Sequence, residues 1–153
     1  MARHSAGILL YRHTPDGMHV LLAHPGGPFW VKRDAGAWTI PKGEFGVDES
    51  AEDAARREFR EELGGEPIGP LRSLGEIVQR GGKHVIAFAL EGDFDAAALR
   101  SNTFDIEWPP RSGRQQSFPE VDRVEWMTLE TAREKILPSQ LVLLDRIAAF
   151  TAA

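Results

Sequence analysis

The segment between Gly43 and Gly64 constrains this chain more than any other part of its sequence. It reads glycine, five residues, Glu49, seven residues, and then Arg57-Glu58-Phe59-Arg60-Glu61-Glu62-Leu63-Gly64. Residues three and four apart share a helical face, so Glu58, Glu61 and Glu62 converge there, and their repulsion costs roughly a few tenths of a kcal/mol per pair. Three carboxylates with no cysteine or histidine among them suit Mg2+ or Mn2+ better than Zn2+, and carboxylate-bound Mg2+ usually serves a phosphorylated substrate. The segment therefore indicates phosphate chemistry.

Local signals predict where this acidic helix begins and ends. Ser50 is placed as an N-cap, with Asp53 three residues later in a variant of the capping box, and Gly64-Gly65 is a stop signal. The predicted helix therefore runs from Ala51 to Leu63. Its apolar residues fall on one stripe, which allows it to pack on one side and present carboxylates on another.

These residues resemble the Nudix box of the Nudix hydrolases, which cleave nucleoside diphosphates linked to another moiety. Every charged and glycine position of that signature is matched, and Phe59 fills the hydrophobic position between the acids. One departure is Gly65, where the box normally has an aliphatic residue, and it concerns local packing rather than the acids. The resemblance spans most of the chain and implies an α+β fold, a Nudix-type α/β/α sandwich with a mixed central sheet.

The order of predicted elements agrees with an α+β fold. Two hairpins are expected, one with strands at 5–11 and 19–23 and the other with strands at 74–79 and 84–90. Short strands are expected at 38–40 and 124–127, and helices at 129–137 and from Gln140 to about Phe150, the last capped by Ser139. The Gly- and Pro-rich stretch 24–37 is expected as a loop near the site entrance. Hairpins mixed with helices favour this fold over a doubly wound parallel sheet.

Length and composition limit the class of protein. A chain of 153 residues fits one domain, so residues 1–153 are expected to form a single Nudix hydrolase domain. No apolar run approaches the roughly 20 residues that cross a bilayer, and the absence of cysteine excludes a disulfide framework, so a cytoplasmic location and no membrane partner are expected. The formal charge of −5 disfavours a broad nucleic-acid surface but not a nucleotide substrate, since divalent ions can bridge acids and phosphates.

The resemblance also implies roles for individual residues. Glu58, Glu61 and Glu62 would divide metal ligation and activation of the attacking water, with Glu61 and Glu62 as principal ligands and Glu58 as a further ligand or the base. The Gly43 carbonyl would contribute to the metal site, whereas Glu49 and Arg57 would hold the loop against the helix through an ion pair. Glu120 lies six residues before Trp126, a spacing at which some relatives carry an additional ligand, although charged loop residues are mostly just solvated.

Candidate substrate contacts lie outside the helix. Lys42 belongs to a Pro-Lys-Gly sequence found in relatives that act on dinucleoside polyphosphates, nucleoside triphosphates and capped RNA, and Lys83 opens a strand similar to one in diadenosine polyphosphate hydrolases. Arg111 and Arg114, close in sequence to aromatic residues within 101–119, could bind phosphates, or this stretch is a surface loop whose aromatics pack on the core edge. Trp30 and His84 are interpreted as packing residues.

The leading hypothesis is a Mg2+-dependent Nudix pyrophosphohydrolase, with Mn2+ also possible, that cleaves a phosphoanhydride in a nucleoside triphosphate or dinucleoside polyphosphate. One alternative is a noncatalytic nucleotide sensor on the same fold. Another is a Nudix enzyme for ADP-ribose or another nucleotide sugar, and a third is a purely structural amphipathic helix. Retention of three acids counts against the sensor, because unneutralised carboxylates bring no benefit unless metal binds. The exact substrate and the oligomeric state stay open.

Overall fold

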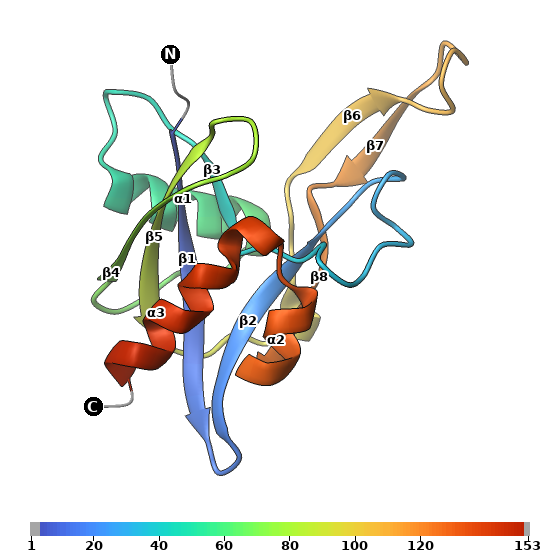
Figure 1. The fold of residues 1–153 in the computed structure, drawn as a ribbon. Helices are drawn as coiled ribbons and strands as arrows, with labels where there is room; N and C mark the ends of the chain where they lie inside the picture. Colours follow the sequence, from blue (N-terminus) through green and yellow to red (C-terminus); the bar gives the residue numbers. More distant parts are fainter. Residues whose placement is uncertain (1–3, 152–153) are drawn as a thin grey trace.

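The computed structural model describes residues 4–151 and shows one mixed sheet between two helical layers (Figure 1). The strand order is β4-β5-β1-β2-β8, and β3 pairs with β1 beside this path. The strands of this sheet are β1 His4–Thr14, β2 Gly17–Pro25, β3 Lys42–Glu44, β4 Arg72–Val78, β5 His84–Glu91 and β8 Val121–Thr128. β1 runs parallel to β5 and antiparallel to β2 and β3, so the expected mixed sheet is confirmed.

Helices cover both faces of the sheet because β1 is apolar on both sides. Ala6, Ile8 and Leu10 point to helix α1 (Ala51–Leu63), in a core cluster that includes Phe59. Leu9 lies in the opposite cluster, which contains residues of α2 (Leu129–Lys135) and α3 (Leu141–Thr151). Alternate residues of a strand face opposite sides, so a central strand buried on both sides carries an apolar residue at nearly every position. The expected α/β/α sandwich is therefore confirmed.

Helix α1 begins and ends as its sequence predicts. The Ser50 hydroxyl accepts a hydrogen bond of 3.1 Å from the Asp53 N–H. At the other end Gly64 has a φ of 83° and its N–H donates to the Arg60 carbonyl at 2.8 Å. A positive φ of this kind is available to glycine without the steric penalty that other residues meet. Both caps thus place the acidic residues in the last two turns.

The predicted hairpins are present, but the prediction of a short strand at 38–40 is wrong. Thr39 and Trp38 make only isolated bridges, to Ala23 and Ile136, and the strand proper is β3 at Lys42–Glu44. The Trp38 N–H donates to the Lys135 carbonyl, and the Trp38 carbonyl accepts from the Leu137 N–H. These bonds tie the segment to the end of α2 instead of extending a strand.

The C-terminal boundaries also differ from the prediction. Helix α2 ends at Lys135, and Pro138–Gln140 form a 3-10 turn, η2, before α3 begins at Leu141. Ser139 therefore lies within the turn and does not cap α3. Gln140 is fully buried, and its Oε1 accepts a hydrogen bond of 3.0 Å from the Ile40 N–H. The Gln140 side chain thus makes a tertiary contact with Ile40, which no local sequence pattern predicts.

The stretch 101–119 is not a loose loop but a two-stranded arm. Strands β6 (Thr103–Glu107) and β7 (Gln115–Pro119) pair antiparallel and form a sheet of their own, preceded by a short 3-10 turn η1 (Ala96–Ala98). Figure 1 shows this arm projecting from the main sheet on the side away from β4 and β5. Within residues 4–151, no helix combines the length and the apolar character needed to cross a membrane.

Replacing Gly64 by alanine should destabilise the protein by about 2 kcal/mol, because alanine is strained at this φ and its Cβ would lie 2.6 Å from the Arg100 Cβ. Urea denaturation measures the free energy of unfolding. Gly46→Ala is the matched control, since an added Cβ there meets no atom of residues 4–151 within 4 Å, and its effect should stay within about 0.5 kcal/mol. Equal effects of the two substitutions would contradict the prediction.

Candidate active site

The candidate site forms where β3 meets the last turns of α1. Gly43 pairs with Ala6 of β1 and lies directly against the carboxylate of Glu58. A Cβ added to Gly43 would lie 2.1 to 2.3 Å from the three carboxyl atoms of Glu58. Only a glycine permits this approach, so the glycine and glutamate of the motif are linked by contact.

The Arg57 guanidinium binds several of the acids at once. Its Nε and Nη2 donate to the two carboxylate oxygens of Glu49 at 2.8 and 2.9 Å, as expected for a loop-to-helix ion pair. Its Nη1 also donates to Glu58 at 2.7 Å and to Glu61 at 3.1 Å, and Nη2 donates to the Glu44 carbonyl at 3.3 Å. The hydrogen bonds from Arg57 lower the pKa of the Glu49 carboxyl group. The same bonds raise the pKa of the Arg57 guanidinium. Bidentate pairing of this kind fixes geometry as well as charge.

The contacts of Arg57 correct the expectation that the three acids of the helix have no counter-charge unless metal binds. Glu58 and Glu61 are not unneutralised, because Arg57 already supplies a counter-charge to both. Glu62 is the acid that has no ion pair with Arg57 in the described part of the chain. Burial and, second, the charge of Glu58 raise the pKa of Glu62 to about 8, while Lys42 opposes the shift. The pKa of Glu58 is also raised, mainly by burial and against the effect of Arg57.

Glu120 reaches the acidic cluster from the base of the β6–β7 arm. The Asn102 N–H donates to the Glu61 carbonyl at 2.9 Å, and the Glu120 N–H donates to the Asn102 carbonyl at 2.8 Å. Desolvation of the Glu120 carboxyl group and the charges of Glu58 and Glu61 raise its pKa. Gly26, at the start of the loop expected near the entrance, donates its N–H to the Glu120 carbonyl at 2.9 Å. Glu120 is therefore in electrostatic contact with the acids of α1.

Lys42 lies next to these acids. The Lys42 N–H donates to Glu62 at 3.4 Å, and burial followed by the charge of Lys83 lowers the pKa of the Lys42 ammonium. The carboxylates of Glu62, Glu44 and Glu58 oppose that shift. Lys42 thus lies beside the acidic cluster, and the charge of Lys83 acts on it.

Arg111 and Arg114 are not brought to the acidic cluster. Both are exposed at the end of the β6–β7 arm, and Figure 1 shows that end pointing away from α1. A five-residue strand advances roughly 13 Å from its first to its last residue, which separates them from Glu120 at the arm's base. Trp108 instead packs on Phe29 with ring centroids 5.3 Å apart. Phosphate binding by Arg111 and Arg114 stays a prediction, and in this structure it would take place away from the acidic cluster.

The donor set fits a hard divalent cation. Its members are carboxylate and carbonyl oxygens, which Mg2+ and Mn2+ prefer, and the glycine cradle at Gly43 holds one carboxylate against β3. Within residues 4–151, the α1 glutamates do not form a group whose ligand atoms all lie within 4.8 Å of one another. Nη1 of Arg57 lies between Glu58 and Glu61. Nη1 binds one oxygen of each carboxylate, Oε1 of Glu58 and Oε2 of Glu61, so a cation can bind the second oxygen of each.

A family model described as the NUDIX domain matches residues 1–147. No curated protein sequence matches the chain. Among solved structures, the Ap4A hydrolase of C. elegans in a binary complex is similar with a TM-score of 0.67 and 23% identity, over 97% of this chain and 98% of that chain.

Two further solved structures resemble this fold. The NUDIX domain of Shewanella oneidensis NrtR, complexed with ADP ribose, has a TM-score of 0.67 and 18% identity over 99% of this chain and 89% of that chain. The MutT protein from Methanosarcina mazei Go1 has a TM-score of 0.66 and 20% identity, over 99% of this chain and 96% of that chain. At sequence identities this low, the similarity to these structures shows a shared fold only.

Replacing Arg57 by glutamine should lower the free energy of unfolding by about 1–3 kcal/mol, because Glu49, Glu58 and Glu61 lose their shared cation. Urea denaturation without divalent ions measures this change. Arg60→Gln is the matched control on the same helix, since Arg60 makes one exposed ion pair, of 3.4 Å, and should change stability by less than about 0.5 kcal/mol. An equally small effect at Arg57 would show that the carboxylates do not need it.

The raised pKa of Glu62 predicts a pH-dependent stability in the metal-free protein. An unfolded chain ionises this group near its ordinary pKa, so between about pH 5 and 8 the folded state binds more protons and stability falls as pH rises. Glu62→Gln removes the titration. Between pH 5 and pH 8.5, we expect the free energy of unfolding of the wild type to fall by about 1–3 kcal/mol relative to this variant. Denaturation in the presence of a chelator measures this change. Parallel stability curves would contradict this.

Proposed function

The chain belongs to the Nudix hydrolase family, and from that premise we propose that it is a Mg2+-dependent pyrophosphohydrolase acting on a nucleoside triphosphate or a dinucleoside polyphosphate. The observation that supports the proposal is the contact of the Glu58 carboxylate with Gly43. Arg57 joins Glu58 to Glu61, and the backbone of Asn102 joins Glu61 to Glu120. These residues come from a helix, a short strand and the base of the arm. A structural helix alone would not need the other two elements.

The proposed metal ligands are Glu61 and Glu62, with the Gly43 carbonyl and Glu120, while Glu58 ligates a further ion or accepts the proton of the attacking water. Bound Mg2+ or Mn2+ would neutralise charge on the phosphate oxygens and make water ionise more readily. Glu58 is suited to accept a proton, because its pKa is already raised by burial while Arg57 holds the carboxylate in place.

Lys42 and Lys83 are proposed to bind the phosphates of the substrate. Burial chiefly lowers the pKa of Lys42 and the positive charge of Lys83 adds to the shift, which supports placing two positive charges at the border of an acidic site. A phosphate chain would relieve their mutual repulsion, which is a reason for binding an anion with several charges there. The Pro-Lys-Gly sequence at Lys42 favours nucleoside triphosphates or dinucleoside polyphosphates within the family.

Arg57 and Glu49 are proposed to position the acids without touching the substrate. The bidentate pair fixes the loop that precedes α1, and the remaining N–H of Nη1 orients Glu58 and Glu61. We also propose that residues 1–153 act as one catalytic unit in the cytoplasm, as expected from their length and composition.

Glu62→Gln should abolish Mg2+-dependent hydrolysis, with a fall in kcat of roughly 100-fold or more, while the folded structure persists. Phosphate and mononucleotide release from nucleoside triphosphates, diadenosine polyphosphates, ADP-ribose and capped RNA is the measurement. Glu52→Gln is the matched control, because Glu52 is an exposed glutamate in the first turn of the same helix, and it should retain wild-type rates.

The outcomes of this screen separate the alternatives. Nucleotide binding without product release under any divalent ion would favour the noncatalytic sensor over the enzyme. Release confined to ADP-ribose or another nucleotide sugar would keep the hydrolase and overturn the substrate class.

A further inference from the structure

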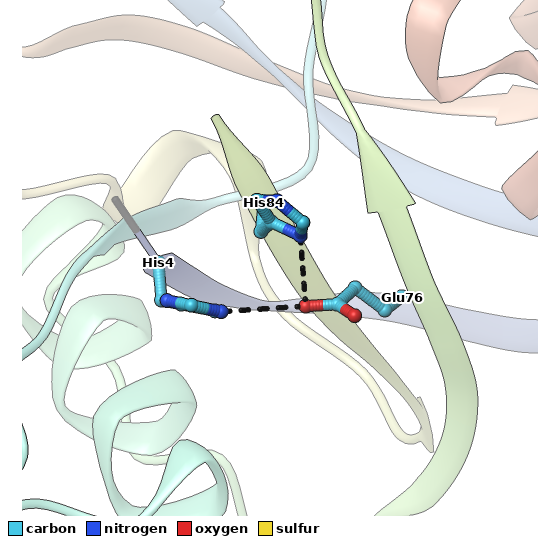
Figure 2. A group of neighbouring side chains, drawn as sticks. All are labelled: His4, Glu76 and His84. Carbon is cyan, nitrogen blue, oxygen red and sulfur yellow. Dashed lines mark ion pairs between the residues drawn. The ribbon is translucent and has the colours of Figure 1, made fainter. Parts of the chain in front are cut away.

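A second group of side chains converges outside the acidic cluster (Figure 2). Nε2 of His4 lies 3.6 Å and Nδ1 of His84 lies 3.3 Å from the same carboxylate oxygen, Oε1 of Glu76. One ligand atom from each residue can be chosen so that all three lie within 4.8 Å of one another. The two imidazole rings have centroids 5.0 Å apart. Two imidazole nitrogens thus approach one carboxylate oxygen.

The sheet topology produces this convergence. Strands β4, β5 and β1 are neighbours, and the parallel register of β1 and β5 pairs His4 with His84. In the antiparallel β4–β5 pair, Glu76 is opposite Ile86, two residues from His84 and therefore on the same face. Each strand contributes one potential ligand. His84, interpreted from the sequence as a packing residue, lies at the centre of the group.

The geometry is that of shared coordination rather than of paired hydrogen bonds. Two ligand atoms of a tetrahedral ion with bonds of about 2.0–2.1 Å lie about 3.3–3.4 Å apart, close to both measured separations. Nδ1 of His84 is buried and has no hydrogen-bond partner among residues 4–151, although Glu76 is near. Ligands of one ion aim at the ion and not at each other, which is why proximity without a hydrogen bond fits a metal site.

We propose that His4, Glu76 and His84 bind a divalent transition-metal ion, for which Zn2+ is the best match. Two imidazoles and a carboxylate are the donors typical of zinc sites that keep an open position. The side chains of His4, Glu76 and His84 are 44%, 45% and 30% exposed, so water can reach the fourth position. Mg2+ prefers an all-oxygen set. The site therefore differs in metal preference from the acidic cluster and does not depend on the proposed function.

Ion binding at this site would join three adjacent strands. A ligand that binds only the folded state stabilises it in proportion to the logarithm of its concentration above Kd. His84 directly follows Lys83, whose charge acts on Lys42. The ion would thus sit at the end of the sheet that also carries the two proposed phosphate-binding lysines.

The test is zinc binding by the full chain without an affinity tag, in excess Mg2+ to occupy the acidic cluster. Competition with a chromophoric chelator gives stoichiometry and Kd, and thermal unfolding reports stabilisation. We expect one equivalent of Zn2+, a raised Tm, and an affinity at least about tenfold weaker in His4→Asn, Glu76→Gln and His84→Asn. His13→Asn, an exposed histidine of the same strand, is the matched control and should bind as wild type does.

Crystals of the wild-type protein soaked in zinc provide a readout that needs no variant. An anomalous peak at the zinc edge, about 2.0–2.2 Å from ligand atoms of His4, Glu76 and His84, would support the proposal. Absence of stoichiometric binding would overturn it. Binding that Glu62→Gln abolishes and His84→Asn leaves intact would also overturn it, because the ion would then belong to the acidic cluster.

Discussion

The guanidinium of Arg57 is the interaction on which the acidic end of α1 depends. It binds the two oxygens of Glu49 and the side chains of Glu58 and Glu61, so one cation holds three like charges in a half-buried space. Without a counter-charge, such carboxylates would repel one another or take up protons. The same contacts anchor the loop before the helix. The position of the proposed catalytic acids and the local stability therefore depend on the same side chain.

Reasoning from the sequence located α1 to the residue because its signals are local. Ser50 and Gly64 act within one turn of the helix ends, and a hydroxyl or a positive φ there has few alternatives. The hairpins were predictable for the same reason, since turn residues set them. Helical spacing predicted a shared face for Glu58, Glu61 and Glu62, and Arg57 binds the first two of them. Glu120 was identified only through family resemblance, since its place near these acids depends on the arm.

What the sequence did not reveal depends on contacts between distant segments. Trp38 bonds to the end of α2 and not to a strand, and Gln140 turns its side chain toward Ile40. Neither partner is visible from a window of neighbouring residues. His4 and His84 adjoin only because β1 and β5 pair in parallel in one register. A one-residue slip would have turned one of them to the opposite face.

The backbone of Glu120 is held on both sides, with its N–H on Asn102 and its carbonyl on the N–H of Gly26. Its attachment is therefore independent of how far β6 and β7 extend beyond it. The whole length of the paired strands β6 and β7 separates residues near Arg111 from the carboxylate of Glu120. The outer part of this hairpin can therefore change in length or composition while the backbone of Glu120 keeps its position.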